Sequence, residues 1–508
     1  MIVPLVKGFM IMCYDEAVTY LLEIPKFAGK AGHENLRAYL HRLDDPIASV
    51  PAIHIAGTNG KGSVCAFLAS ILGCAGYRVG MFTSPHLMKI NERFRIGEEL
   101  ITDDEFLNVF RRVKQVVDQG IAGGQEHPNF FEFLFLMAAC WYRDMWQEGQ
   151  VDYVIYETGL GGRLDATNVL SPCLTVITSI GLDHMQYLGD TIAEIAGEKA
   201  GIMKKGVPCV YLTEPIDALA VIEERAREVS APLLPVEPSQ IIIENCDKDW
   251  IDFRYHSMYD RTCTYRIRST ALYQTDNAML AVTAAEYLLS GEAGRNVAED
   301  RIQQWIRQGL ATMCWRGRME ELLPDFYVDG AHNEPAIQAF CNTITRIYRD
   351  KSVILLFAVS SDKSYNKMIG MLCESLTLKE VIVTAIYGAR TTPVSRVADL
   401  FRTYIGSGDE IEDGVPVGDV MLTADGQTVG DTVLTADGQT VGDTMLTADG
   451  QQKDLPAITI KEDLKDAYEY AKEQLAGTED CRVFCVGSLY LVGSLMELQN
   501  EEAGNSII

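Results

Sequence analysis

Short apolar segments of the kind that form buried strands alternate with helical segments along most of this chain. Strands are predicted near residues 52–56, 78–82, 151–156, 174–178 and 208–212, and helices near 63–75, 103–118, 131–147 and 191–203. After Arg318 the alternation resumes with FYVDGA, a helix from Glu334, SVILLFAV, a helix, EVIVTAI, a helix, AITI, a helix from Glu462 and RVFCVGS. Consecutive strands that are separated by helices usually pair in parallel. The pattern therefore predicts an α/β protein with parallel sheets.

The length of the chain and one change of pattern predict two domains. Residues 236–270 alternate polar and aromatic residues (WIDFRYHS, CTYRIRS), which indicates a patch of antiparallel strands. With 508 residues, of which 47% are hydrophobic, the chain is longer than one core usually supports. We expect a first domain over residues 1–312 and a second, smaller α/β domain over residues 313–508.

Three nearly identical twelve-residue units follow one another at residues 417–452: VGDVMLTADGQT, VGDTVLTADGQT and VGDTMLTADGQQ. Each Asp-Gly suits a tight hairpin turn between short strands. The units contain six acidic residues and no basic one, so they could equally form no fixed structure. The glycine pattern of calcium-binding nonapeptide repeats is absent. We expect a peripheral insertion that takes no part in the chemistry.

Charge and composition argue against several classes of protein. The net charge of −27 disfavours nucleic acid and anionic membranes as partners. No apolar run reaches the roughly 18 residues of a membrane span, and MIVPLVKGFMIM at the start lacks the basic region and cleavage site of a signal peptide. We expect a cytoplasmic protein, whose start could also be Met10 or Met12. The thirteen cysteines form no CxxC pair and lie mostly in apolar stretches, such as Cys65, Cys140 and Cys485, which predicts reduced, buried thiols.

Residues 53–63, IHIAGTNGKGS, join a predicted strand to a predicted helix through a glycine-rich turn. They depart from the usual phosphate-loop signature, because Gly62 separates Lys61 from Ser63. Backbone N–H groups and a helix N-terminus would still converge on an anion, and Lys61 would add a full charge. Glycines at positions 57, 60 and 62 would let phosphate oxygens approach the backbone. An ordinary strand-to-helix turn is the alternative at this point.

Polar residues also follow other predicted strands. Ser84 lies in TSPHL, Glu157 ends VDYVIY, Asp183 and His184 follow LTVIT, and Lys199 lies in GEKAGI on the next helix. Taken singly, each suits a strand end, a loop or a solvated helix. Because the carboxyl ends of parallel strands meet at one edge of a sheet, we expect these residues to lie near the glycine-rich turn. A hydroxyl, a carboxylate and an imidazole at that place suit a divalent metal bound to nucleotide phosphates.

Several longer motifs occur along the chain in this order: GTNGKGS, SPHL, ETGLGGRLDATN, SIGLDHMQYLG, GEKAGI, QTDN, WRGRME, VDGAHNEP and VGSLYLVG. With these motifs the chain resembles the folylpolyglutamate synthases, a branch of the Mur ligase family whose bacterial members often act as dihydrofolate synthases too. The resemblance covers nearly the whole chain apart from the repeats. It implies a P-loop-type Mur ligase ATPase domain followed by a smaller Rossmann-like α/β C-terminal domain. The implied activity is the ATP-dependent addition of L-glutamate to tetrahydrofolate through an acyl phosphate, and dihydropteroate is a possible second substrate.

The resemblance also implies roles for individual residues. The ATP phosphates would contact Gly60, Lys61, Gly62 and Ser63, and other parts of the nucleotide would contact Asn277, Arg318 and Asp329. Magnesium would be bound by Ser84, Glu157 and His184. The pterin would lie against Phe131, Glu132, Leu164, Asp165 and Ala166. Catalysis would use Lys61, His184, a carbamylated Lys199 and His332.

Three positions depart from the family pattern, and alternatives to the ligase stay open. Leu272-Tyr273 replaces the usual Gly-His, Arg316 a common proline, and Glu334 the proline after GAHN. These changes affect the expected nucleotide-base contacts more than the metal site. Another Mur-type amino-acid ligase, disfavoured by GLGGRLDATN, and a P-loop kinase or regulatory NTPase are the rivals, together with a non-catalytic descendant. We expect a monomer that takes small-molecule substrates.

Overall fold

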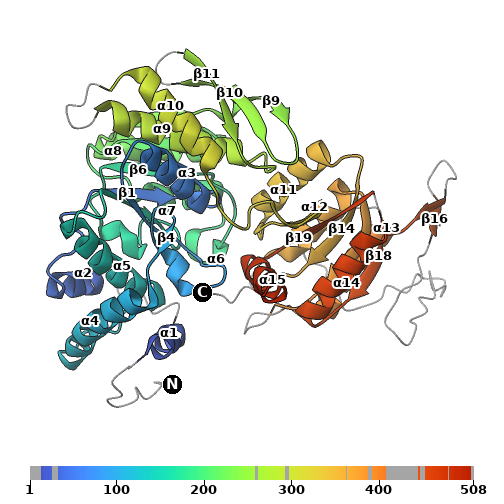
Figure 1. Cartoon of the computed structure of the whole chain (residues 1–508), viewed down its shortest axis with the longest axis horizontal. Helices are drawn as coiled ribbons and strands as arrows, with labels where there is room; N and C mark the ends of the chain where they lie inside the picture. Colours follow the sequence, from blue (N-terminus) through green and yellow to red (C-terminus); the bar gives the residue numbers. More distant parts are fainter. Residues whose placement is uncertain are drawn as a thin grey trace. The chain divides into compact units, whose positions relative to one another are not determined.

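The computed structural model describes residues 13–25, 33–257, 261–291, 297–361, 363–386, 392–407, 444–446, 452–478 and 480–504. The chain divides into two compact units, coloured along the sequence in Figure 1. Unit 1 comprises Met1–Arg268 and Gln274–Trp315, and unit 2 comprises Ser269–Tyr273 and Arg316–Ile508. The alternative start residues Met10 and Met12 lie outside the described residues.

Unit 1 is built on a sheet whose described strands number eight, in the order β4-β3-β2-β5-β1-β6-β7-β8. The strands are β1 (Ala52–Ala56), β2 (Val79–Phe82), β3 (Phe94–Ile96), β4 (Glu99–Leu100), β5 (Tyr153–Glu157), β6 (Leu174–Ile177), β7 (Cys209–Leu212) and β8 (Leu233–Val236). The six strands from β2 to β8 in this order are parallel, and β3 and β4 add an antiparallel edge. The predicted parallel sheet is confirmed. Strand β1 is buried along its whole length, as its apolar sequence AIHIA requires.

The helices of unit 1 follow the apolar periodicity of the sequence. They are α1 (Tyr14–Glu23), α2 (His33–Arg42), α3 (Lys61–Cys74), α4 (Asp103–Ala122), α5 (Phe130–Gln147), α6 (Met185–Leu188), α7 (Ile192–Ala200), α8 (Ile216–Val229), α9 (Gln274–Gly291) and α10 (Glu299–Thr312), with short 3-10 helices η1 (Ile90–Arg93), η2 (Ala166–Val169) and η3 (Pro238–Gln240). Helices α3, α4, α5 and α7 confirm the four predicted helices. Helix α3 is apolar on most sides because it packs against both α9 and α10 (Figure 1).

The predicted antiparallel patch is also confirmed. Strands β9 (Ile242–Cys246), β10 (Ile251–Ser257) and β11 (Arg261–Ile267) form an antiparallel sheet in the order β11-β10-β9. Inward-facing Phe253 and Tyr265 are paired across β10 and β11 and buried. The alternation of polar and aromatic residues therefore reflects a sheet with one buried face.

Unit 2 repeats the α/β pattern with its own sheet, whose described strands number six, in the order β12-β13-β19-β14-β15-β18. The strands are β12 (Glu320–Leu323), β13 (Phe326–Val328), β14 (Ser352–Phe357), β15 (Leu378–Val383), β18 (Ala457–Ile460) and β19 (Cys481–Val486); the helices are α11 (Glu334–Ile347), α12 (Tyr365–Ser375), α13 (Val394–Ser407), α14 (Leu464–Ala476) and α15 (Leu489–Glu502). All strands except β12 run parallel. Each element predicted after Arg318 is present.

Only part of the repeat segment falls within the described residues. Strand β16 (Thr444–Leu446), from the third unit, pairs antiparallel with β17 (Gln452–Asp454). Residues 408–443 and 447–451, which contain the rest of the repeats, lie outside the described residues.

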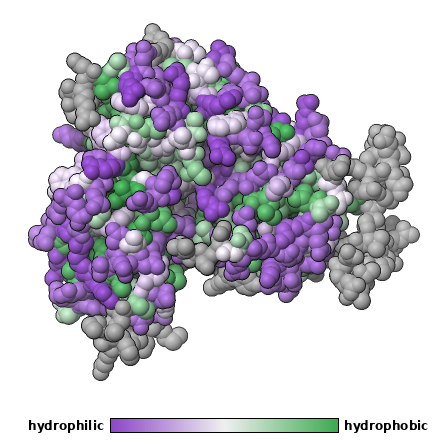
Figure 2. Space-filling view, viewed as in Figure 1, coloured by the Kyte–Doolittle hydropathy of each residue, from purple (hydrophilic) through white to green (hydrophobic). Residues whose placement is uncertain are grey.

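The cysteines that the sequence analysis singled out are buried free thiols, as predicted. The thirteen cysteines are free, and Cys65, Cys140 and Cys485 are buried. Hydrophilic residues cover most of the face seen in Figure 2, with small hydrophobic areas between them. In the described part of the chain, no helix is long and apolar enough to cross a membrane.

The contact between α10 and α3 is close enough to require a glycine, which gives a test of the fold. A Cβ atom on Gly309 would lie 2.5 Å from the Cα atom of Ile71. We expect Gly309→Ala to lower the free energy of unfolding of unit 1 by about 2 kcal/mol, because backbone cannot move aside cheaply. The control is Gly73→Ala in α3, where nothing lies within 4 Å, and which should raise stability by up to about 1 kcal/mol. Urea unfolding measures both, and equal effects would contradict the packing.

Candidate active site

The glycine-rich turn lies between β1 and α3, where the sequence placed it. Gly60 is the N-cap residue of α3 and has φ 84°, a left-handed conformation that disfavours other residues. A Cβ atom at Gly60 would collide with Oδ1 of Asn277, in the first turn of α9. Two residues predicted to contact the nucleotide, which lie far apart in the sequence, are therefore in close contact. The turn presents a helix N-terminus and backbone N–H groups, as a phosphate loop does.

The segment after β6 holds this loop in place. The backbone N–H of Thr58 donates to the carbonyl oxygen of Ser179 at 2.7 Å, and the Thr58 hydroxyl donates to that of Gly181 at 3.1 Å. The hydroxyl of Thr178 donates to the carbonyl oxygen of Asn59 at 2.6 Å. Because these bonds fix the loop before any ligand binds, little ordering is needed on binding.

Two lysine side chains meet at one carbonyl oxygen of the loop. Nζ of Lys61 donates to the carbonyl oxygens of Gly57 and Thr58, both at 3.1 Å. Nζ of Lys199, on α7, donates to the same Gly57 oxygen at 2.8 Å. Lys199 is only 3% exposed. Burial, followed by the charge of Lys61, lowers the pKa of Lys199 to about 7, although Asp183 opposes the shift.

The three residues expected to bind magnesium follow three strands of the same sheet edge. Glu157 ends β5 and is 4% exposed. Its Oε2 accepts a hydrogen bond of 3.0 Å from the backbone N–H of Ser84, which follows β2. His184 follows β6 as the N-cap residue of α6, with Nε2 3.8 Å from Oδ2 of Asp183. In the sheet β2, β5, β1 and β6 are consecutive, so these residues flank the phosphate loop.

The donor set fits a magnesium ion that is bound largely by phosphate oxygens and water. It offers a carboxylate, a hydroxyl and an imidazole, and the buried hydroxyl of Thr158, next to Glu157, has no hydrogen-bond partner within the described structure. Among the described residues, no group of three or more His, Cys, Asp or Glu side chains could hold a metal by itself. Mg²⁺ usually takes one or two protein carboxylates plus substrate phosphates, which agrees with this set.

The residues expected to bind the pterin gather where α5 begins. Phe131 and Glu132 lie in the first turn of α5, and a Cβ atom on Gly159 would lie 2.8 Å from the Phe131 ring. Glu132 caps the helix by accepting from the Asn129 N–H at 2.8 Å. Burial raises the pKa of Glu132, and the charge of Asp165 adds to this shift. The start of α5 therefore faces the loop that connects β5 to η2.

That loop is organised by the carboxylate of Asp165. Its Oδ2 accepts from the Leu160 N–H at 2.9 Å, and its Oδ1 accepts from the N–H and hydroxyl of Thr167 at 3.0 and 2.5 Å. Burial raises the pKa of Asp165 although these bonds oppose the shift. Leu164 is 60% exposed, whereas Ala166 is buried. Leu164 is therefore the accessible apolar side chain of this loop.

The predicted residues of unit 2 form a cluster of their own. Oδ2 of Asp329 accepts from the Tyr273 hydroxyl at 2.6 Å and from the Met319 N–H at 2.9 Å. Arg318 opposes the rise in the pKa of Asp329 that burial causes. Nδ1 of His332 lies 2.7 Å from the carbonyl oxygen of Gly330, so Nδ1 carries the proton. The departure from Gly-His noted in the sequence thus places a hydroxyl on the Asp329 carboxylate.

Sequence reasoning did not identify Trp315 as part of the loop's surroundings. A Cβ atom on Gly62 would lie 2.9 Å from Cζ2 of the Trp315 ring, so this ring packs on the first turn of α3. The guanidinium carbon of Arg95 lies 5.7 Å from the centre of the same ring. The sequence shows this tryptophan directly before RGR, but nothing in the sequence indicates that it packs on the glycine-rich turn.

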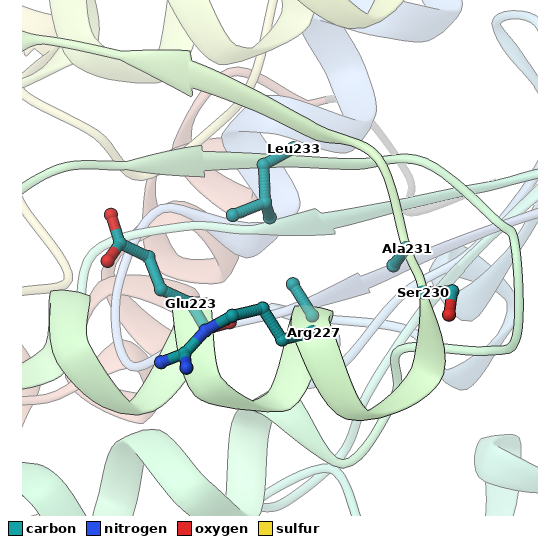
Figure 3. Close-up of a pocket in the computed structure, with 6 residues that line it drawn as sticks. Glu223, Arg227, Ser230, Ala231 and Leu233 are labelled. Atoms are coloured by element: carbon teal, nitrogen blue, oxygen red, sulfur yellow. The ribbon is translucent and has the colours of Figure 1, made fainter.

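A pocket of about 400 Å³ lies away from these residues, at the end of α8 and the start of β8 (Figure 3). It is lined by Glu223, Ala226, Arg227, Ser230, Ala231 and Leu233. No residue predicted from the sequence lines it.

Comparison with known proteins identifies relatives that match about 70% of this chain, although no protein-family model matches it. The dihydrofolate synthase/folylpolyglutamate synthase of Bacillus subtilis is 37% identical over 365 residues, which cover 71% of this chain and 83% of the relative. The folylpolyglutamate synthase of Lacticaseibacillus casei is 31% identical over 361 residues, covering 70% and 82%.

Solved structures of similar proteins share the fold. The Mycobacterium tuberculosis folylpolyglutamate synthase complexed with ADP superposes with a TM-score of 0.76 at 23% identity, covering 96% of this chain and 98% of that one. Escherichia coli FolC in complex with DHPP and ADP has a TM-score of 0.73 at 22% identity, covering 98% and 99%.

The contact between Gly60 and Asn277 gives a test of the loop. We expect Gly60→Ala to raise the KM for ATP at least about tenfold, because the collision displaces the loop by more than a hydrogen bond tolerates. Gly76→Ala is the matched control: Gly76 has φ 92° and nothing within 4 Å, so it carries only the backbone strain of about 1–2 kcal/mol.

Nucleotide titrations of both variants measure the difference. The double variant Gly60→Ala/Asn277→Ala, which removes the colliding side chain, should unfold at a higher urea concentration than Gly60→Ala. Equal KM values for the Gly60 and Gly76 variants would contradict the role of the close contact.

Proposed function

Because the chain belongs to the folylpolyglutamate synthase family, we propose that it is an ATP-dependent ligase that adds L-glutamate to a reduced folate. The observation that carries this proposal is the 37% identity to a relative of which the chain covers 83%, together with a phosphate loop flanked by Lys61, Lys199 and Glu157. That relative is named for dihydrofolate synthase as well. Dihydropteroate is therefore proposed as a second substrate.

The proposed reaction has two steps. A carboxylate is a poor acyl donor, so a carboxylate oxygen of the folate attacks the γ-phosphorus of ATP, ADP leaves, and an acyl phosphate forms. The amine of L-glutamate then attacks the acyl carbon and loses a proton, and phosphate leaves. Lys61 and the N–H groups of the loop would stabilise the charge on the transferring phosphoryl group. Lys61 now donates to the uncharged carbonyl oxygens of Gly57 and Thr58. A charged phosphate oxygen is a stronger acceptor, so the ammonium would move to it when ATP binds.

Magnesium would be bound by Ser84, Glu157 and His184. When bound, the ion would neutralise part of the negative charge on the phosphates. The bond from the Ser84 N–H orients the Glu157 carboxylate. Asp183, beside His184, accepts the His184 backbone N–H at 2.9 Å and so fixes the turn that carries the imidazole.

Lys199 is proposed to act as a carbamate. Only a neutral amine adds to CO₂, and the lowered pKa of about 7 makes the neutral form of this buried side chain available near physiological pH. The ammonium first loses one proton; the neutral amine then forms an N–C bond to CO₂ and loses a second proton, so a buried cation becomes an anion. Next to Lys61 and a divalent cation, that anion would be attracted where an ammonium is repelled.

The remaining roles follow the family resemblance. Phe131, Glu132, Leu164, Asp165 and Ala166 are proposed to hold the pterin, supported by their grouping at the start of α5 and in the adjacent loop. Asn277, Arg318 and Asp329 are proposed nucleotide contacts, and His332 a contact to phosphate or glutamate. In this proposal residues 1–312 bind ATP and folate, and residues 313–508 form the glutamate ligase domain. We further propose a monomer located in the cytoplasm, with no nucleic-acid or membrane partner.

One assay distinguishes the ligase from its rivals. Purified protein is incubated with ATP, L-glutamate and either tetrahydrofolate or dihydropteroate, and ADP and glutamylated product are measured. ADP release that needs both the folate and glutamate supports the ligase. ADP release without either of them would indicate a kinase or NTPase, and a requirement for another acceptor would indicate a different Mur-type ligase.

Lys61→Ala tests the phosphate loop. We expect ligation to fall at least about a hundredfold while the melting temperature stays unchanged, because the ammonium stabilises transition-state charge and packs little. Lys114→Ala is the control: this α4 lysine pairs with Asp118 at 2.7 Å on the surface and should leave the rate unchanged. Normal turnover by folded Lys61→Ala would refute the assignment.

Lys199→Ala tests the carbamate. Activity should be mostly lost, and acetate or formate should restore part of it by supplying the missing anion. Removing CO₂ from the wild type should lower its activity, and adding bicarbonate should restore it. The activity of the wild type should also decline as the pH falls below about 7, where the amine becomes protonated. Full activity of Lys199→Ala, or a CO₂-free wild type that needs no bicarbonate, would contradict the proposal.

A further inference from the structure

A buried histidine connects the strand of the phosphate loop to the loop proposed to bind the pterin. His54 is the middle residue of β1, shortly before Gly57, and its side chain is fully buried. Its Nε2 lies 2.7 Å from the hydroxyl oxygen of Thr167, in η2. That hydroxyl donates in turn to Oδ1 of Asp165. The three side chains therefore form one hydrogen-bonded chain.

The direction of each bond in this chain is determined. The hydroxyl of Thr167 has a single proton, which it donates to the Asp165 carboxylate. Nε2 of His54 must therefore be the donor to the Thr167 oxygen, so the ring is the neutral tautomer with its proton on Nε2. Burial, with a smaller effect of Lys204, lowers the pKa of His54 to about 3, which agrees with a neutral ring. Nδ1 is then an acceptor, and it has no partner within the described structure.

The location of His54 leaves it no direct part in the chemistry. A side chain with no exposed surface cannot touch a substrate, and a ring that stays neutral cannot act as a general acid at neutral pH. What His54 does reach is the hydroxyl that orients the Asp165 carboxylate. A second histidine, His33 in α2, lies with Nε2 2.9 Å from the backbone carbonyl oxygen of Asp165, so the same loop has a second hydrogen bond from another element.

We propose that His54 is a positioning residue that holds the Asp165 loop in the conformation that binds the folate, acting through the hydroxyl of Thr167. This inference rests on the proposed ligase function. Because β1 carries the phosphate loop at its carboxyl end and His54 in its middle, one rigid strand sets the place of both substrates. A shift of about 1 Å between two bound reactants can lower the rate about a hundredfold. A hydrogen-bonded link that fixes the two binding loops relative to each other would prevent such a shift.

The link should affect the folate and not the nucleotide. Loss of a hydrogen bond to a charged group typically weakens an interaction about tenfold or more. Breaking the hydrogen bonds that link His54, Thr167 and Asp165 is therefore expected to raise the KM for folate about tenfold or more. The KM for ATP should change less than about twofold, because the bonds that Thr58 of the phosphate loop donates to the carbonyl oxygens of Ser179 and Gly181 stay in place.

Four variants test the inference in the full-length protein. His54→Met and Thr167→Val remove the hydrogen-bonding groups at similar volume, whereas His54→Gln and Thr167→Ser keep a donor in each place. KM for tetrahydrofolate, KM for ATP, kcat and the melting temperature are measured for each. We expect the first two to show the selective rise in folate KM, and the second two to stay within about threefold of the wild type. The double variant His54→Met/Thr167→Val should be no worse than the poorer single variant, since both break one chain.

The possible failures are distinguishable. If the wild type shows no folate-dependent turnover, the proposed function falls and the inference with it. If the wild type is active and folded Thr167→Val keeps its folate KM, or raises both KM values equally, the inference alone is overturned. Should His54→Met fail to fold, Thr167→Val and the comparison of His54→Gln with the wild type decide the matter by the same criterion.

Discussion

The carbonyl oxygen of Gly57 is the point on which the proposed site depends. Two lysine side chains, from α3 and α7, donate to this single oxygen. Burial, followed by the charge of Lys61, disfavours the charged form of Lys199 and lowers its pKa, so Lys199 can more readily lose a proton. In the proposed site, a triphosphate would compensate the positive charge of Lys61, and conversion to a carbamate would remove the positive charge of Lys199. Both lysine side chains are therefore already in place before the proposed ligands bind.

Strand β1 determines how the other parts reach that point. It lies between β5 and β6 in the sheet, so the residues after β5 and β6 lie on its two sides at the same edge. Parallel strands end together, and a strand buried on both faces is rigid. Glu157 and His184 need no contact with each other to share a ligand, because the sheet has already placed both beside the phosphate loop.

The elements and the edge of the sheet were predictable from the sequence because both follow from local patterns. Strand and helix periodicity identified the strands near the site, and the parallel order then gathered their carboxyl ends. Long-range side-chain partners were not predictable in this way. Asn277 at Gly60, His54 at Thr167 and the Tyr273 hydroxyl on Asp329 depend on tertiary packing, and the residue types alone suit many partners. The substitution at Tyr273 was visible in the sequence, but its hydrogen bond was not.

Because the protein is strongly acidic, the binding of anionic substrates must depend on groups close to the site. A net charge of −27 repels ATP, folate and glutamate, which are all anions, so association receives no help from the overall field. Binding must come from groups within a few ångströms, where partial burial weakens screening by salt. In the proposed site, a helix N-terminus, the Lys61 ammonium and a divalent cation would meet this need at the phosphates. The proposed carbamate on Lys199 would replace a nearby cation with an anion that attracts the divalent cation, whereas an ammonium would repel it. In that proposal the carbamate acts on ATP through the metal, and its loss is expected to weaken metal-dependent steps before it weakens the fold.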